Sequence, residues 1–143
     1  MNVIVDTSVW SLSLRKKGPS NQTLQQSSTL QTTLQKLIQS GNVVLLGAIR
    51  QELLSGIRFQ AQYNKLKTRL RAFPDLPTEI EDYELAAQYF NTCRQNGVQG
   101  SNTDFLICAA ARRRNYSILT ADKDFEHFSQ HIPINFFPLN LTL

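Results

Sequence analysis

The sequence predicts an α/β fold in which helices cover both faces of a largely parallel sheet. Apolar runs at 2–6, 43–46 and 116–120 are typical of buried parallel strands, and 134–137 is a shorter candidate. Between these runs, apolar residues recur at steps of three and four, which is typical of helices. Because strands and helices alternate along the chain, we expect helical crossovers between neighbouring strands.

The helical segments have recognisable ends and faces. Gly41 is a natural cap for the first long helix, and the apolar stripe from Phe59 to Phe73 marks a later one, with a short edge strand near Ala72 as an alternative for its end. We expect helices over 21–39, from 47 or 48 onward, along the 59–73 stripe, over 78–96 and over 102–114. The helix over 78–96 is expected to turn Tyr83, Ala86, Ala87, Phe90 and Cys93 inward.

Length and composition bound the class of protein. The 143 residues fit one domain with a substantial core, so we interpret 1–143 as a single domain, and 41% hydrophobic residues are typical of a soluble globular protein. The chain lacks an apolar stretch near the roughly 20 residues that span a bilayer, and it starts in a strand without a charged leader. We therefore expect no membrane association and a cytoplasmic location. Cys93 and Cys108 are expected to be buried and reduced, and no Cys/His pattern supports zinc.

Five of the eleven acidic residues lie in four short segments beside apolar runs: Asp6, Glu52, Asp104, Asp122 and Asp124. Asp6 and Asp122 follow strands, and the ligand crevice of an open parallel sheet lies beyond the carboxyl ends of its strands. Two like charges about 4 Å apart repel by about 4 kcal/mol at an effective dielectric of about 20. If these acids converge, they need a cation, and all-oxygen ligands favour Mg²⁺ or Mn²⁺.

Each acid also has a structural interpretation. Asp6 can cap the helix that follows it, and Asp122 or Asp124 can cap the next helical segment. Glu52 has no Lys or Arg three or four residues away, so its alternative is an unpaired surface position. Asp104 occupies the last position of a capping-box pattern. On the sequence alone these alternatives stay open.

Four short motifs, taken in order, resemble the PIN-domain nucleases, in particular the toxin ribonucleases of the VapC type. The resemblance covers essentially the whole chain and implies a three-layer PIN-like fold with a central, mainly parallel sheet of about five strands. The motifs are Val5-Asp6-Thr7-Ser8, Gln51-Glu52-Leu53-Leu54-Ser55-Gly56, Asn102-Thr103-Asp104-Phe105-Leu106-Ile107-Cys108-Ala109-Ala110 and Leu119-Thr120-Ala121-Asp122-Lys123-Asp124-Phe125.

The resemblance also implies a function and a site. It implies an Mg²⁺- or Mn²⁺-dependent endoribonuclease, the toxin of a type II toxin–antitoxin pair, with an antitoxin that covers the site and a tendency to form homodimers. Asp6, Glu52, Asp104 and Asp122 match the family's four catalytic acids, and Asp124 matches an auxiliary one. Asp6, Asp104 and Asp122 are expected to hold the metal, which activates a water for attack on the phosphate.

The remaining groups have supporting roles in this hypothesis. Glu52 is expected to orient the attacking water or to ligate a second ion. Thr7 and Thr120 are expected to donate hydrogen bonds to the acids. His127 and His131 lie away from the acidic motifs, so a metal-free, histidine-based ribonuclease is not expected.

A net charge of +4 is compatible with RNA as the substrate. The basic residues gather in three places, at 15–17, 65–71 and 112–114. Each cluster can contact the phosphates of RNA, or it can be a solvated helix edge without a ligand.

Two other functions compete with the nuclease hypothesis. One is a catalytically silent PIN-type module that binds RNA or a protein partner. The other is a phosphoacceptor signalling domain, which requires an Asp after a middle strand and a Lys after a late strand. Neither residue is evident from the sequence.

Overall fold

A computed structural model describes residues 1–14 and 21–139, without the side chains of 14 and 21–27. The predicted basic loop at 15–17 lies outside these residues. The elements are β1 (Val3–Val5), α1 (Thr7–Leu14), α2 (Asn21–Gln39), β2 (Val43–Val44), α3 (Gly47–Leu54), α4 (Gln60–Leu70), α5 (Ile80–Gln95), α6 (Asn102–Arg114), β3 (Ser117–Leu119) and α7 (Asp124–Phe128).

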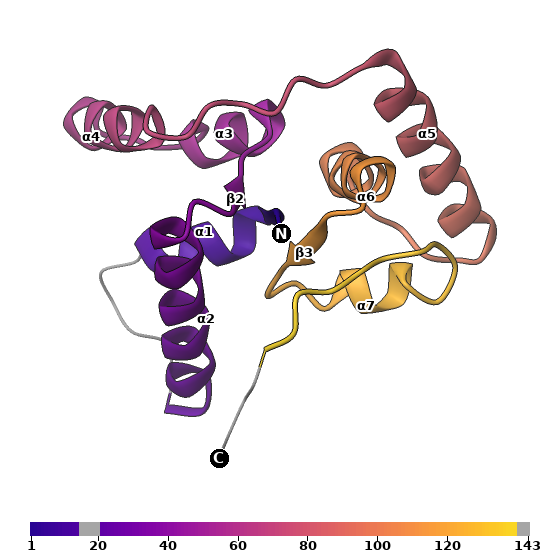
Figure 1. The fold of residues 1–143 in the computed structure, drawn as a ribbon, viewed down its shortest axis with the longest axis horizontal. Helices are drawn as coiled ribbons and strands as arrows, with labels where there is room; N and C mark the ends of the chain where they lie inside the picture. The colour runs from indigo at the N-terminus through magenta and orange to yellow at the C-terminus, as the bar shows by residue number, and fades with distance from the viewer. Residues whose placement is uncertain (15–20, 140–143) are drawn as a thin grey trace.

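The sheet is parallel and has β1 at its centre, in the order β2-β1-β3. Val3 pairs with Val43 on one side, and Val5 pairs with Leu119 on the other. In Figure 1 the helices α1 to α4 gather on one side of the short strands and α5 to α7 on the other. The predicted α/β class, with a parallel sheet flanked by helices, is therefore confirmed.

The prediction of about five strands is wrong for the described part of the chain, which has three. The outer positions carry single parallel bridges instead, Leu45 with Asp75 and Ile118 with Phe136. Prolines stand close on both sides of the outer segments, at 74 and 77 and at 133 and 138. Because proline cannot donate a ladder hydrogen bond, each bridge does not extend into a strand.

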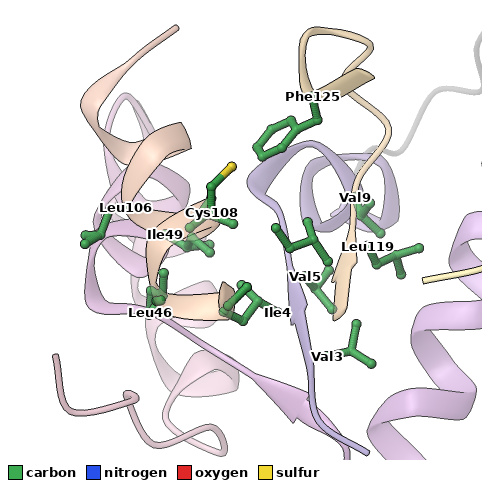
Figure 2. Packing of buried hydrophobic residues seen from close by; sticks show 14 of the residues in the cluster. Val3, Ile4, Val5, Val9, Leu46, Ile49, Leu106, Cys108, Leu119 and Phe125 are labelled. Atoms are coloured by element: carbon green, nitrogen blue, oxygen red, sulfur yellow. The ribbon is translucent and has the colours of Figure 1, made fainter. Parts of the chain in front are cut away.

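The core is built around the central strand. Val3, Ile4 and Val5 have no exposed surface, and every residue of α6 from Phe105 to Ala111 is buried. Figure 2 shows Ile4 beside Leu46, on the side of β1 opposite Val3, as the alternation of a strand requires. The burial of β1 fixes the position of the residue that follows it, which is Asp6.

The buried face of α5 differs from the predicted one. Tyr83 and Ala87 are exposed, whereas Asp82 and Tyr89 are buried. Asp82 is held inside by Arg114, a partner 32 residues further along the chain. Ala86 and Cys93 are buried as predicted. Phe90 is half-buried, and the inner face comprises Asp82, Ala86, Tyr89 and Cys93.

The stripe predicted from 59 to 73 forms α4, but only its middle lies in the core. Leu66 and Leu70 are buried, whereas Phe59, directly before the helix, is 60% exposed. Phe73 is half-buried and packs edge-on against Trp10. The predicted alternative of an edge strand near Ala72 is wrong, since 71–73 forms a turn at the end of α4.

Two predictions from composition can also be compared with the structure. Cys93 and Cys108 are buried free thiols, as expected. Across the described residues, none of the helices combines the length and apolar character needed to cross a membrane.

Candidate functional site

A cavity of about 610 Å³ opens beyond the carboxyl ends of β1 and β3. The four predicted catalytic acids all line it, although they come from four separate parts of the chain. Asp124 is not among the lining residues. The cavity is lined by Asp6, Thr7 and Ser8, by Ala48, Gln51, Glu52 and Ser55 of α3 and its end, by Thr103 and Asp104 of α6, and by Asp122.

Asp6 is the single residue between β1 and α1, and its backbone is held at both ends. Its N–H donates to the Leu119 carbonyl at 2.9 Å, and its carbonyl accepts from the Val9 N–H at 3.0 Å. The side chain is buried, and its Oδ2 accepts from Ser8 Oγ at 2.7 Å and from Thr120 Oγ1 at 2.9 Å. The contact that would cap α1, from the Ser8 N–H, is long at 3.4 Å. Orientation by hydroxyl groups therefore outweighs helix capping at this position.

Glu52 reaches the same cavity from α3. Its side chain is exposed, and Oε1 accepts a 2.7 Å hydrogen bond from Thr7 Oγ1. The predicted role of Thr7 as a donor is confirmed. This hydrogen bond joins the first residue of α1 to α3, and both residues line the mouth of the cavity.

Asp104 both caps α6 and lines the cavity. Its Oδ2 accepts from the Ser101 N–H at 3.1 Å, and its own N–H donates to Ser101 Oγ at 3.1 Å, which completes the predicted capping box. Burial raises the pKa of this carboxyl, and the negative charges of Asp6 and Asp122 raise it further. The raised pKa indicates that the charged form of this carboxyl is disfavoured unless a positive charge lies nearby.

Asp122 is positioned by the turn after β3. Its N–H donates to Thr120 Oγ1 at 3.0 Å, and its Oδ1 accepts from the Asp124 N–H at 2.9 Å. Thr120 thus orients two acids, because it also donates to Asp6. Asp124 is exposed at the first residue of α7.

Ser8 is a site residue whose role the sequence did not indicate. Its Oγ donates to Asp6 and accepts from the Ala121 N–H at 3.0 Å, so it joins the two chain segments that follow β1 and β3. Its place in the first acidic motif was visible, but Ala121 is 113 residues away. A contact over that separation leaves no local sequence signal.

The cavity acids are not neutralised by basic side chains of the described residues. No Lys or Arg in that part of the chain lines the cavity or forms an ion pair with these acids. The hydrogen bonds to each carboxylate go to one oxygen: Oδ2 of Asp6, Oε1 of Glu52, Oδ2 of Asp104 and Oδ1 of Asp122. Within the same residues, the second oxygen of each carboxylate has no donor and is left for a ligand.

This donor set fits a hydrated Mg²⁺ or Mn²⁺. No three Asp, Glu, His or Cys side chains within 1–13 and 28–139 are already positioned around one point for a metal ion. Mg²⁺ does not require such a cage, because it keeps several waters and binds through one or two carboxylates. The cavity offers oxygen donors and space for water, without thiolate or imidazole groups.

The fold and the site together define an α/β protein with a carboxylate pocket at the carboxyl ends of a parallel sheet. A family model described as PIN domain matches residues 3–130, so the chain belongs to the PIN-domain family. PIN domains are typically nucleases and generally use Mg²⁺ or Mn²⁺. A comparison with curated proteins found no match.

Solved structures with the same fold include toxin–antitoxin PIN proteins. FitAcB from Neisseria gonorrhoeae has a TM-score of 0.71 and 21% identity, covering 95% of this chain and 96% of that one. VapBC2 from Rickettsia felis, bound to a DNA fragment from its promoter, has a TM-score of 0.70 and 17% identity, covering 96% and 98%. VapBC-1 from nontypeable Haemophilus influenzae has a TM-score of 0.70 and 16% identity, covering 96% and 97%.

Proposed function

We propose that this chain is an Mg²⁺- or Mn²⁺-dependent endoribonuclease and the toxin of a type II toxin–antitoxin pair. The observation that carries the proposal is the convergence of Asp6, Glu52, Asp104 and Asp122 on one cavity without a neutralising cation among the described residues. Asp6, Asp104 and Asp122 are the proposed metal ligands, directly or through the waters that the ion keeps, and Glu52 is the fourth catalytic acid. A single domain over 1–143 and a cytoplasmic location belong to the same proposal.

When bound, the cation supplies a Lewis acid that activates water and stabilises charge growing on the phosphate oxygens. The chain's own groups set the geometry. Ser8 and Thr120 hold one oxygen of Asp6 and leave the other for the ligand. Glu52, held by Thr7 at the mouth, orients the attacking water by accepting its hydrogen bond. The backbone bonds of the Ser101–Asp104 capping box hold the third acid in place.

The partners follow from the same proposal. We propose a small antitoxin that covers the cavity, and the similar solved structures named VapBC and FitAB support it. A homodimer is the proposed state of the toxin. RNA is the proposed substrate, because a chain of net charge +4 surrounds an acidic cavity that a cation can convert into a phosphate site.

The decisive experiment is Asp6→Asn, assayed for Mn²⁺-dependent cleavage of single-stranded RNA. We expect cleavage to fall by at least about a hundredfold, because loss of a metal ligand removes several kcal/mol of transition-state stabilisation. Glu84→Gln is the control, since it removes the charge of an exposed acid of α5 that does not line the cavity, and it should keep full activity. Wild-type cleavage by a stably folded Asp6→Asn variant would refute the proposal.

A catalytically silent PIN-type module is the first alternative. It is favoured if the wild-type chain binds RNA without cutting it and a Mn²⁺ titration finds no bound metal.

One observation supports the phosphoacceptor alternative, and another speaks against it. The expectation that no Asp follows a middle strand is wrong, because Asp6 follows β1, the centre of the described sheet. However, Thr120 follows β3, and no Lys of the described residues lines the cavity. Phosphorylation of the chain by a small phosphodonor, lost in Asp6→Asn, would favour this alternative.

A further inference from the structure

The segment next to the cavity carries a net charge of +5, whereas the other residues, with 10 of the 15 Lys and Arg and all 11 Asp and Glu, sum to −1. Residues 58–71, which we call the α4 segment, contain five basic residues and no acid, so their charge exceeds the net charge of +4 for the whole chain. These basic residues are Arg58, Lys65, Lys67, Arg69 and Arg71.

None of these five cations forms an ion pair with a described residue, whereas Arg50, Arg113 and Arg114 do. Arg50 binds Asp75, and the two arginines of α6 bind Asp82. The charge of the α4 segment is therefore available to an external polyanion, and that of Arg113 and Arg114 is not.

Aromatic rings lie among these cations. Phe59 is 60% exposed, and the Arg58 guanidinium carbon lies 5.7 Å from its ring centre. Tyr63 is half-buried, with Lys67 Nζ 5.8 Å from its ring centre. An exposed ring with a cation over one face is the arrangement on which an unpaired base stacks while its phosphate meets positive charge.

The α4 segment is continuous with the wall of the cavity. Glu52 and Ser55 line the cavity at the end of α3, and Gly56 turns the chain with a φ of +83°. Phe59 follows Ser55 by four residues, which span at most about 14 Å. Figure 1 shows α3 leading directly into α4.

We propose that the α4 segment, with Phe59 as a base-stacking residue, is the subsite that guides single-stranded RNA into the acidic cavity. This inference extends the proposed nuclease function. It rests on that function, because the cavity is taken as the place to which the strand is guided. Single strands are favoured over duplexes because the Phe59 ring can stack only on a base that has left its own stack. An RNA strand also matches a surface whose charges are all positive, which an ordinary protein surface of mixed charge does not.

The test is binding of a fluorescently labelled oligouridine to the full chain, measured by anisotropy in EDTA so that no cleavage occurs. We expect Phe59→Ala to weaken binding by about 5- to 150-fold, the range for loss of one base–aromatic stack. Phe59→Trp should restore binding. Thermal unfolding should be unchanged, because Phe59 is largely exposed.

A matched control exists on α5, where Arg94 lies 6.0 Å from the Phe90 ring centre. Arg58→Ala should weaken binding and lower the salt slope by about one, as expected for a lost phosphate contact, whereas Arg94→Ala should do neither. Wild-type affinity of Phe59→Ala overturns the proposal. Equal losses for duplex and single-stranded RNA also overturn it.

The outcomes separate this proposal from the nuclease function. If Phe59→Ala binds normally while Asp6→Asn abolishes cleavage, only the subsite is wrong. If the wild-type chain cuts no RNA but Phe59→Ala still loses binding, the subsite stands and the chain is a binding module.

Discussion

Helix α6 has an acidic cluster at each end, and the two clusters are stabilised in opposite ways. At its N-terminus, Asp104 shares the cavity with three other acids and no described cation. At its C-terminus, Arg113 and Arg114 form ion pairs with Asp82 of α5. One helix therefore separates an acid whose charge is neutralised by arginines from acids that have no cation partner among the described residues.

The Asp82 cluster is complete without any ligand. The Asp82 side chain has no exposed surface and accepts from Arg113 Nη1 at 2.7 Å, from Arg114 Nη1 at 2.8 Å and from Arg114 Nη2 at 2.9 Å. The hydrogen bonds from Arg114 hold the pKa of Asp82 well below its usual range, with Arg113 and the Glu79 N–H adding to the effect. The same contacts raise the pKa of both guanidinium groups.

The comparison corrects one prediction and supports another. For the basic cluster at 112–114 the sequence left RNA contact and a solvated helix edge open, whereas in the structure Arg113 and Arg114 hold α5 against α6. Because both arginines pair with a buried carboxylate, their role is to stabilise the fold. The cavity acids, by contrast, gain orientation from hydroxyls and N–H groups but no charge compensation from the described residues, which is the condition that a bound cation relieves.

The largest effect is expected from Asp82→Asn, which breaks the neutralised cluster. Removing one partner of a buried ion pair costs about 3–5 kcal/mol, and here two guanidinium groups lose their counter-charge. Urea unfolding at pH 7 measures the loss. Glu81→Gln is the control, because that side chain is 60% exposed and lies 3.7 Å from Arg113, and it should change stability by less than about 0.5 kcal/mol.

Asp104→Asn is expected to lower activity without lowering stability, in contrast to Asp82→Asn. The variant keeps an oxygen for the Ser101 N–H and removes a charge that burial and two neighbouring acids disfavour. We expect RNA cleavage to fall by about a hundredfold, while the melting temperature in EDTA stays the same or rises. A loss of stability as large as that of Asp82→Asn would contradict the contrast between the two ends of α6.

A smaller effect is expected from Thr120→Val, which keeps the shape of the side chain and removes the hydroxyl shared by Asp6 and Asp122. Loss of such an orienting group typically lowers metal affinity by about 10- to 100-fold. Calorimetric titration with Mn²⁺ measures this change. Thr32→Val on the exposed side of α2 serves as the control and should bind Mn²⁺ like the wild type.

The smallest effect concerns pH. Because the folded pKa of Asp82 is lowered from an ordinary value of 3.8, its stabilisation is complete above that value and is lost as pH falls toward the folded pKa. Between pH 5 and pH 3 we expect the wild type to lose about 1 kcal/mol more than Asp82→Asn, since each pH unit is worth at most about 1.36 kcal/mol per proton. Parallel urea curves for both proteins across this interval would contradict the assigned pKa shift.

The features that the sequence predicts well are those with local causes. Helix α6 has the predicted bounds because the capping box of Ser101 and Asp104 begins it and Asn115, at a φ of 59°, ends it. Asp6 and Asp122 were found because acids within a few residues of the end of an apolar strand mark the carboxyl edge of a parallel sheet.

The features that were missed depend on distant partners. The bond from Ser8 to Ala121 spans 113 residues, and the inner face of α5 depends on Arg114. Strand number was overestimated because apolar content at 134–137 indicated a strand, whereas the prolines at 133 and 138 limit pairing to one bridge.

The central place of β1 has a consequence for the order of events during translation. During translation β1 is made before its pairing partner β3, which follows more than a hundred residues later. Until Thr120 and Asp122 have left the ribosome, Asp6 lacks the hydroxyl of Thr120, and the cavity lacks one of its four acids. The four carboxylates can therefore meet only after the segment that follows β3 has been synthesised.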